Sequence, residues 1–287
     1  MKTTKISVII TVKNTSEAIS ACLSGFLNQT VIPQIIIVGP NKDIEKIKKS
    51  LNRGQIMGIQ FIDYLGGKNE ARNIGFNESS GDFVLYSDQD MIPETNLMEK
   101  STKMLKDFDA IIIPEKGTGG PGFLEKVHSL EKELVMEDVD ALTPRLFKRS
   151  MFNNGEVPFD RKFGILDEWG FNLKLKTKNP RIGIVKSFFT VENNLTLLEE
   201  MKKNFKKGLW IRNLIAADKE EGLRRINPVK RGIQFYGKRL VFLKKEPIFF
   251  SGLVLLKFID LASFFLGYLT SFVVRSQSLD DKVSKLS

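Results

Sequence analysis

The sequence contains a single cysteine, Cys22, and a single histidine, His128, among its 287 residues. One cysteine excludes an intramolecular disulfide and a cysteine-based zinc site, and it is typical of a reducing compartment. One histidine excludes a metal site built from several histidines, and a Ser-His-Asp triad would have to depend on His128. Because His128 lies in a helix-like run, residues 123–135, far from any Gly-x-Ser-x-Gly turn, we expect it to have a structural or surface role.

Acidic residues are too few to balance the basic ones, and the formal net charge is +10. Most of this excess lies in residues 199–245, which hold 14 Lys and Arg against 5 Asp and Glu. The attraction of a phosphate fades within about 8–10 Å at physiological salt. A basic segment directly before an apolar one is therefore typical of a surface that faces lipid headgroups, and we predict no nucleic-acid partner.

Long disordered or low-complexity stretches and internal repeats are absent from the sequence. The chain is 42% hydrophobic and 10% aromatic, which excludes disordered and fibrous classes and allows one substantial core. We therefore expect one main domain followed by a tail whose character changes near residue 199.

Short apolar runs alternate with helix-like segments over the first 114 residues. The run at 6–12 is too short for a signal peptide and predicts a buried strand. Apolar residues spaced at i, i+3 and i+4 over 19–27 predict an amphipathic helix, with its N-cap within residues 14–17. Further strands are predicted at 34–38, 82–87 and 110–114, and a further helix at 69–77. This alternation predicts a parallel α/β sheet.

Polar residues follow three of these strands where each one ends. They are Thr11, the Gly-Pro-Asn run at 39–41, and the Asp-Gln-Asp run at 88–90. Parallel sheets bind ligands at the carboxyl ends of their strands, so these residues are expected to form one site. Two carboxylates with a one-residue gap suit Mg²⁺ or Mn²⁺, which take oxygen ligands from one or two carboxylates and from phosphate. Alone, the pair has an ordinary alternative, because turns are rich in aspartate.

Residues 66–90 give the acidic pair a specific context. A small-residue loop leads to Ala-Arg-Asn-Ile-Gly at 71–75 and then to a strand that ends in Asp-Gln-Asp. This arrangement resembles the signature of family 2 glycosyltransferases, and residues 7–14 and 22–30 resemble the first strand and helix of that family. The resemblance implies the GT-A fold, which is Rossmann-like with a mostly parallel central sheet flanked by helices. It also implies a C-terminal helical, membrane-associated region.

The resemblance implies roles for several residues of a nucleotide-sugar site. Thr11 and Lys13 would lie beside the nucleotide, Arg72 near its base or diphosphate, Asp88 near the ribose and the metal, and Asp90 on the metal. The alternatives are a helix cap for Thr11, a surface cation for Lys13 and a helix-face ion pair for Arg72. The cofactor would be Mn²⁺ or Mg²⁺.

Two features of this sequence depart from the family pattern. Many members carry an aspartate after the second strand that holds the nucleotide base, whereas this chain has Val-Gly-Pro-Asn-Lys-Asp at 38–43. Base recognition is therefore expected from Asn41, Asp43 or the backbone. Many members also carry a metal-ligating histidine before the basic segment, and residues 190–192 contain none. The metal would then be held by Asp90, diphosphate and water.

A second acidic pair, Asp167 and Glu168, precedes Trp169 in a helix-like run. Acids in the first turn of a helix are common because they complement its N-terminus. The run also resembles the family's Glu-Asp-Trp motif, whose second acid is the catalytic base. The order is reversed here, and alignment gives Glu168 the role of base with Asp167 beside it. On the acceptor side the resemblance adds Trp169 and Arg145, and an internal ion pair is the alternative for Arg145.

The predicted activity is an inverting, metal-assisted transfer of sugar from a nucleotide-sugar to a hydroxyl of a lipid-linked or polysaccharide-precursor acceptor. We expect the nucleotide-sugar to be a UDP-sugar. A hydroxyl nucleophile needs a base, whereas an ionised lipid phosphate does not, so the second acidic pair favours a hydroxyl. One alternative is a polyprenyl-phosphate glycosyltransferase. The other is a catalytically silent GT-A domain that serves as a membrane-bound binding or scaffold subunit.

The predicted domains follow the same reading. Residues 1–198 would form the catalytic domain, with its donor half at about 1–115 and its acceptor half at about 116–198. Residues 199–247 would form a basic amphipathic helical segment. Residues 248–287 would form apolar membrane-associated helices and a short polar tail.

The apolar block at 248–274 is 27 residues long, enough to cross about 30 Å of hydrocarbon. Lys257 and Asp260 interrupt it and can pair at i, i+3. Cations flank both ends, which favours both ends on the cytoplasmic face and predicts interfacial helices or a re-entrant hairpin instead of a span. The alternative is a buried helix pair in the interface of a homo-oligomer.

Overall fold

A computed structural model describes residues 5–15, 17–136, 142–153, 155–192, 196–227 and 246–273. The chain divides into two compact units. The first contains residues 1–118, 135–161 and 170–192, and the second contains residues 119–134, 162–169 and 193–287. The boundary expected between residues 198 and 199 stays a prediction.

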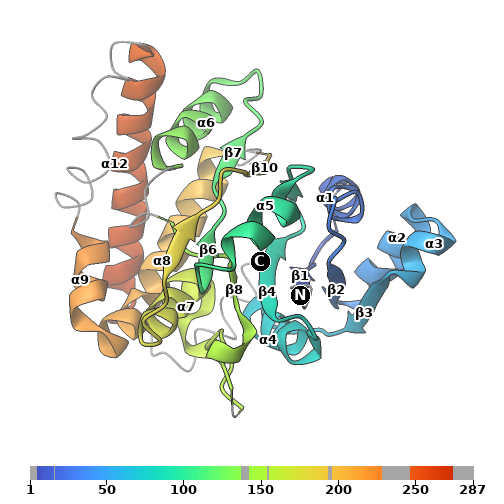
Figure 1. Ribbon diagram of the computed structural model, residues 1–287. Helices are drawn as coiled ribbons and strands as arrows, with labels where there is room; N and C mark the ends of the chain where they lie inside the picture. The colour runs from blue at the N-terminus through green and yellow to red at the C-terminus, as the bar shows by residue number, and fades with distance from the viewer. Residues whose placement is uncertain are drawn as a thin grey trace. The chain divides into compact units, whose positions relative to one another are not determined.

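A seven-stranded sheet forms the centre of the first unit (Figure 1). Its strands, in spatial order, are β3 (Ile59–Asp63), β2 (Gln34–Gly39), β1 (Ile6–Thr11), β4 (Phe83–Asp88), β8 (Leu146–Lys148), β6 (Ala110–Ile112) and β9 (Ile182–Ile184). The first four run parallel to one another, and β6 is parallel to β9. Only β8 is antiparallel to its two neighbours. The mixed but mostly parallel sheet confirms the predicted fold class.

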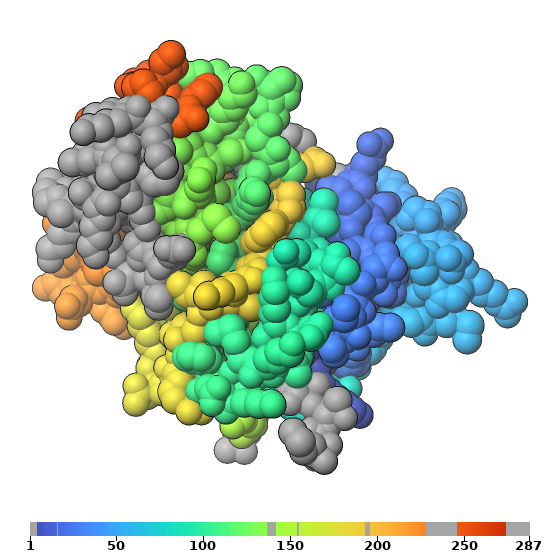
Figure 2. Space-filling view, turned by 45° about the horizontal axis from the view of Figure 1, so that its top comes forward, coloured from blue at the N-terminus to red at the C-terminus, as the bar shows by residue number. Residues whose placement is uncertain are grey.

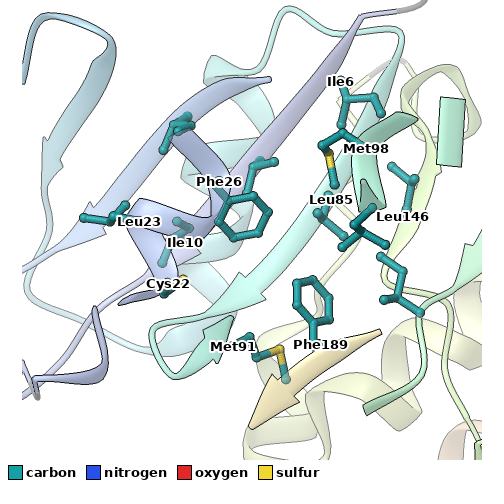
Figure 3. Close-up of a cluster of buried hydrophobic side chains, with 14 of the residues drawn as sticks. Ile6, Ile10, Cys22, Leu23, Phe26, Leu85, Met91, Met98, Leu146 and Phe189 are labelled. Atoms are coloured by element: carbon teal, nitrogen blue, oxygen red, sulfur yellow. The ribbon is translucent and has the colours of Figure 1, made fainter. Parts of the chain in front are cut away.

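The central strands are apolar on both faces because helices cover both sides. Val8 and Ile10 of β1 belong to the same buried cluster as Leu23 and Phe26 of α1 (Ala18–Leu27), shown in part in Figure 3. On the opposite face, Ile9 of β1 packs in a cluster with helix α4 (Lys68–Glu78). The remaining helices within residues 1–115 are α2 (Asn41–Ser50), α3 (Arg53–Met57) and α5 (Leu97–Met104).

A second, three-stranded sheet has the order β5-β10-β7. Its strands are β5 (Met91–Pro93), β10 (Phe189–Val191) and β7 (Glu115–Gly117). The sequence therefore returns from residue 191 to pair with the segment that directly follows Asp90. Two short 3-10 helices, η1 (Arg149–Met151) and η2 (Arg161–Leu166), precede helix α7 (Asp167–Lys176).

The first helix starts where the sequence predicts, but without a side-chain cap. α1 begins at Ala18, and its N-cap Glu17, within the expected residues 14–17, makes no side-chain capping bond. Thr15 instead donates its hydroxyl to Asp43 at 2.7 Å, and the backbone N–H groups of Asn14 and Thr15 donate to the same carboxylate. A partner far along the chain thus replaces the local cap.

The second unit contains four helices among its described residues. They are α6 (Phe123–Val135), α8 (Leu197–Ala217), α9 (Lys219–Ile226) and α12 (Pro247–Thr270). α8 starts with a capping box formed by Thr196 and Glu199. The predicted basic segment and polar tail reach into residues 228–245 and 274–287, which lie outside the described residues.

α12 is one unbroken helix over Pro247–Thr270, so the re-entrant hairpin expected within the apolar block is wrong. No proline or glycine pair interrupts residues 248–270. Lys257 and Asp260 are accommodated without a break because they pair with each other at 2.8 Å on one face of the helix. Among the described residues, α12 is the helix that is long and apolar enough to cross a bilayer.

Candidate donor and metal site

Three strand ends meet at one edge of the large sheet. Thr11, the last residue of β1, is in register with Val38 of β2 on one side and with Asp88 of β4 on the other. Gly39 closes β2 against the chain that leaves β1, and a Cβ at this position would lie 2.4 Å from a methyl carbon of Val12. The absence of a side chain therefore allows these two strand ends to approach closely. The predicted convergence of the strand ends is confirmed.

Asp88 is held by two cations from the helix packed on the sheet. One oxygen, Oδ1, accepts a hydrogen bond from Arg72 at 3.0 Å and lies 2.8 Å from Nζ of Lys68. Both cations reach the same carboxylate because they are four residues apart on α4, one helical turn. Burial alone would raise the pKa of Asp88, but the charges of Lys68 and Arg72 outweigh it and hold that pKa far below its ordinary value. Asp88 is therefore a fixed, ionised carboxylate.

Arg72 is completely buried, which for an arginine requires compensation from its surroundings. Its guanidinium carbon lies 4.5 Å from the ring centre of Tyr86 and 5.0 Å from that of Phe159. The ring of Tyr86 also has a second cation near it, since the guanidinium carbon of Arg145 lies 5.2 Å from its centre. Such contacts between cations and aromatic faces stabilise the charges, and Asp88 neutralises the charge of Arg72.

Arg145 is buried like Arg72 and forms an ion pair with Glu115 at 2.9 Å. Its charge also contributes to the lowered pKa of Asp88. The alternative that an internal ion pair holds Arg145 thus has structural support. An acceptor role for Arg145 stays a prediction.

Four of the five positions in the run at 71–75 have separate structural tasks. Ala71 packs against the buried residues of β2. The side chain of Asn73 makes two hydrogen bonds with the backbone of Phe159, as a neighbouring strand would. It donates to the carbonyl of Phe159 at 2.6 Å and accepts from the N–H of Phe159 at 3.0 Å. A Cβ on Gly75 would lie 2.4 Å from a methyl carbon of Ile9. The run therefore fixes Arg72 by docking α4 on the sheet and by holding the loop that carries Phe159.

Asp90 differs from Asp88 in its electrostatic environment. Burial and the nearby charge of Asp88 raise the pKa of Asp90 above its ordinary value of 3.8. No salt bridge joins Asp90 to a cation within the described ranges. A carboxylate in this state gains from a cation, and one or two carboxylates together with phosphate oxygens are the ligand set that Mg²⁺ and Mn²⁺ accept. The residues present thus fit a divalent metal at Asp90, with Asp88 beside it.

The protein alone does not provide a complete metal cage. Among the described residues, no group of three or more His, Cys, Asp and Glu side chains could hold an ion. Mg²⁺ often keeps waters and binds through one or two carboxylates plus substrate phosphates. A metal at Asp90 would therefore depend on a ligand that brings phosphate.

The loop residues expected near the nucleotide have different environments. Lys13 is exposed, and its carbonyl accepts a hydrogen bond from Gln89 at 3.3 Å, which brings the loop after β1 next to the acidic run. Asn41 is exposed at the start of α2, where its backbone N–H donates to Asp63 at 2.8 Å. Asp43 is buried. Burial raises its pKa, but the hydrogen bonds from Thr15 and Asn14 outweigh this effect and lower it.

These contacts separate Asn41 from Asp43. The carboxylate oxygens of Asp43 are used in shaping the loop after β1, whereas the side chain of Asn41 points from an exposed position at the end of β2. Of the two, Asn41 is the residue whose surroundings better suit contact with a nucleotide base.

The second acidic pair lies in the first turn of α7, as predicted. Asp167, Glu168 and Trp169 belong to the second compact unit, whereas the donor-site residues belong to the first. Within the second unit, the guanidinium carbon of Arg225 lies 5.0 Å from a ring centre of Trp169, and Arg225 pairs with Glu221 at 2.8 Å. Trp169 is thus held by α9 and is partly exposed.

A family model described as glycosyl transferase family 2 matches residues 7–172 of this chain. The chain belongs to glycosyl transferase family 2. Among curated proteins, a search finds no match.

Solved structures agree with this family 2 fold. The mannosyltransferase PcManGT from Pyrobaculum calidifontis, in complex with GDP-Man and Mn²⁺, is similar with a TM-score of 0.63 at 12% identity, covering 93% of this chain and 87% of its own. S. aureus TarS 1–349 in complex with UDP-GlcNAc is similar with a TM-score of 0.50 at 15% identity, covering 97% of this chain and 92% of its own. A longer S. aureus TarS chain is matched over 73% of this chain and 40% of its own length, at 17% identity and a TM-score of 0.48.

Several residues of the candidate site were not given a role from the sequence alone. Lys68, Asn73, Tyr86 and Phe159 all support Asp88 or Arg72, and of these only Phe159 lies outside the recognised run at 66–90. Lys68 could have been found from its i, i+4 spacing to Arg72. Phe159 could not, because 87 residues separate it from Arg72 and its position depends on the loop that Asn73 holds.

Proposed function

We propose that this chain is an inverting glycosyltransferase that moves a sugar from a nucleotide-sugar to a hydroxyl group. The donor would be a UDP-sugar, and the acceptor a lipid-linked glycan or a polysaccharide precursor. The observation that carries the proposal is the pair of carboxylates after β4, of which Asp88 is paired with Arg72 and Lys68 while Asp90 forms no salt bridge with any described residue. This is the electrostatic arrangement that a metal and a diphosphate would complete.

The charges around the acidic pair support a metal-assisted reaction. Lys68, Arg72 and Arg145 balance Asp88, Asp90 and Glu115, so the cluster is close to neutral by itself. A nucleoside diphosphate adds negative charge that this neutral cluster does not offset. Asp90 and Asp88 would hold Mn²⁺ or Mg²⁺, and the ion would supply the positive charge that the leaving diphosphate requires.

Residues of the strand ends would bind and orient the donor. Thr11 and Lys13 would lie beside the nucleotide, with Asn41 near its base. Arg72 would act on the diphosphate through Asp88, because its own guanidinium is buried. Two solved relatives of the same fold contain UDP-GlcNAc and GDP-Man with Mn²⁺, which supports a nucleotide-sugar donor.

Glu168 would serve as the base, with Asp167 beside it. The carboxylate of Glu168 would take the proton of the acceptor hydroxyl while the acceptor oxygen bonds to the anomeric carbon. The bond between that carbon and the diphosphate oxygen breaks, and the displacement inverts the anomeric configuration. Trp169, partly exposed and held by Arg225, offers an apolar surface on which a sugar ring of the acceptor could lie.

The proposed location is the cytoplasmic face of a membrane. The apolar helix α12 and the basic excess of residues 199–245 support it. Acceptors linked to lipid are presented at such a surface.

Donor hydrolysis tests the enzymatic proposal without knowledge of the acceptor. UDP- and GDP-sugars are incubated with the full chain, with and without Mn²⁺, and the released nucleotide is measured. We expect slow, metal-dependent release from one donor class, abolished in Asp90→Ala and retained in Asp107→Ala, an exposed aspartate on another loop. Absence of turnover from any donor, with folded protein and measurable nucleotide binding, would favour the silent scaffold subunit.

The acceptor class is tested with Glu168→Gln. A hydroxyl acceptor requires the base, so transfer to membrane-extracted glycolipid should fall by about 10²-fold or more while donor binding is unchanged. If the variant still transfers sugar to polyprenyl phosphate at the original rate, the acceptor is an ionised phosphate and the hydroxyl proposal fails.

A further inference from the structure

Helix α12 exposes apolar residues and turns charged ones inward, the opposite of a helix at a water-exposed surface. Its exposed residues from Ile248 onward follow one stripe and are apolar except for one serine: Ile248, Ser251, Val254, Leu255, Phe258, Ala262, Phe265, Leu266 and Leu269. Its charged pair, Lys257 and Asp260, is turned toward neighbouring helices of the same unit. A helix in water places its polar face outward, so this stripe is suited to a nonaqueous environment.

The inward face of α12 is fixed by polar contacts with two other helices. Lys257 pairs with Glu131 of α6 at 2.8 Å, and Asn204 of α8 donates to Asp260 at 2.7 Å. Beside them, His128 and Glu200 lie 3.1 Å apart and are both buried. His128 thus has the structural role expected from the sequence. These contacts prevent rotation of the charged pair toward the exposed side.

Helix α8 accompanies α12 along most of its length (Figure 1). Their backbones approach closely where Gly208 faces Phe264 and where Gly267 faces Phe205. Near the end of α12, Arg212 donates to the carbonyl of Ser271 at 2.8 Å. Because contacts run in the same order along both helices, they are parallel, and a crossing of the membrane by α12 would carry α8 across with it.

The lysines of α8 exclude a crossing orientation. Lys202 and Lys203 are exposed, and Lys206 and Lys207 are partly exposed. If α12 crossed the bilayer, this cationic stretch would enter the hydrocarbon beside it, where lysine is strongly disfavoured. The same lysines are favourable at the headgroups of an anionic membrane.

From these observations we infer that α12 lies flat in a single leaflet of an anionic bilayer, with its exposed stripe among the acyl chains and the cations of α8 at the headgroups. The inference deepens the membrane location proposed above and rests on it. A second copy of the chain is a less favourable partner for the apolar stripe than lipid, because pairing two such surfaces would bring the α8 lysines of the two copies together. Figure 2 shows surface atoms of α12, in red-orange, beside those of α6, in green, whose Phe123 contacts Phe249 and extends the apolar surface.

Vesicle flotation of the full chain is the first test. We expect binding to vesicles of phosphatidylcholine with phosphatidylglycerol, weaker binding to phosphatidylcholine alone, and loss of the difference at high salt. The double variant Leu255→Glu with Phe258→Glu should bind these vesicles at least about tenfold more weakly, a loss of about 1.4 kcal/mol or more. The matched control Ile32→Glu with Met57→Glu changes two exposed apolar residues of the first unit and should bind normally.

Depth measurements distinguish a flat helix from a crossing one. Single cysteines at 255, 258, 266 and 269 are labelled with a fluorophore and quenched by lipids that carry quenchers at known depths; the native Cys22 is buried and does not label. The flat orientation predicts similar, shallow depths at all four positions. A depth that passes through the bilayer centre along the series, unchanged binding of the acidic double variant, or a stable dimer that shields the stripe without lipid would overturn the inference.

The outcome is separable from that of the enzymatic proposal. Donor hydrolysis does not need vesicles, so a chain that hydrolyses donor but fails to bind vesicles retains its proposed activity and loses this inference. A chain that binds vesicles with uniform shallow depth but hydrolyses no donor retains the inference and loses the activity.

Discussion

Arg72 is a residue whose charge has no access to solvent and whose partner, Asp88, lies at the edge of the candidate site. The Asp88 side chain remains 23% exposed, whereas that of Arg72 is 0% exposed. The rings of Tyr86 and Phe159, which contact the guanidinium of Arg72, hold that group in place together with the docking of α4 on the sheet. The arginine therefore positions Asp88 and keeps it ionised.

Replacing Arg72 with Met should destabilise the fold. The substitution keeps much of the volume but removes the buried cation that is hydrogen-bonded to Asp88, and loss of one partner of a buried pair costs about 3 kcal/mol. Because the pKa of Asp88 is lowered in the folded state, its contribution is present above the ordinary value of 3.8 and is lost as the pH falls below it. The difference in free energy of unfolding between Arg72→Met and the unmodified chain should therefore become smaller toward pH 3.

Urea unfolding at pH 7 and pH 3 provides the measurement. Arg181→Ala is a suitable control, because Arg181 pairs with Asp109 at 3.3 Å on the exposed surface and such pairs contribute about 1 kcal/mol or less. An Arg72→Met chain as stable as this control would show that the buried pair is not important for the fold.

Asp90 is expected to reduce stability when no metal is bound. Its raised pKa means that ionisation is less favourable in the folded chain than in the unfolded one. Asp90→Asn should thus raise the free energy of unfolding at neutral pH, and the gain should disappear below the ordinary pKa of 3.8, where both states are protonated. Mn²⁺ affinity in the unmodified chain should fall as the pH drops through this raised pKa.

Both effects can be followed in EDTA-treated protein, by thermal unfolding across a pH series and by metal titration with a nucleoside diphosphate present. Asp107→Asn should change neither quantity, because Asp107 is exposed. If Asp90→Asn destabilises the metal-free chain at pH 7, the electrostatic account of Asp90 is wrong.

At the level of elements, the docking of α4 on β1 decides whether Lys68 and Arg72 reach Asp88. Gly75 is the point of closest approach, with no room for a Cβ beside Ile9. Gly75→Ala should therefore cost about 1–3 kcal/mol through overpacking, and it should weaken donor binding as α4 shifts.

Gly58→Ala is the matched control for this change. A Cβ there would have its nearest neighbour at 3.6 Å, and the residue has ordinary helical backbone angles. Its substitution should be neutral or stabilise by about 0.4–1 kcal/mol. Equal effects of the two substitutions in thermal unfolding would show that α4 tolerates movement on the sheet.

The same scale shows where sequence patterns sufficed for the fold. The strands β1, β2 and β4 were predicted within a residue of their observed ends, because continuous apolar runs closed by turn residues are strong local signals. The N-cap of α1, Glu17, lies within the predicted residues 14–17, but the side-chain bond of Thr15 was not predicted, since its partner Asp43 is 28 residues away and no local pattern reports such a contact.

For the whole molecule, the sequence predicted which acidic residues form the candidate site but not which side chains hold them in place. The acidic run and Arg72 were identified through the family signature, while the roles of Lys68 and Tyr86 required the packing of α4 against β4. The pairing of Lys257 with Asp260 at i, i+3 was predicted, but the hairpin suggested by cations at both ends of the apolar run was wrong, because the partners of this pair on α6 and α8 cannot be read from the sequence.

The central claim is that Asp90 holds a metal together with a nucleotide-sugar at the end of β4. Thermal unfolding of the full chain with a panel of UDP- and GDP-sugars, with and without Mn²⁺, tests it most directly. A ligand at 100 times its Kd stabilises the native state by about 2.7 kcal/mol. We predict a clear rise in Tm for one donor class with Mn²⁺, little rise without Mn²⁺, and no metal-dependent rise in Asp90→Asn, while Asp107→Asn behaves like the unmodified chain. The absence of any shift, or a full shift in Asp90→Asn, would contradict the account.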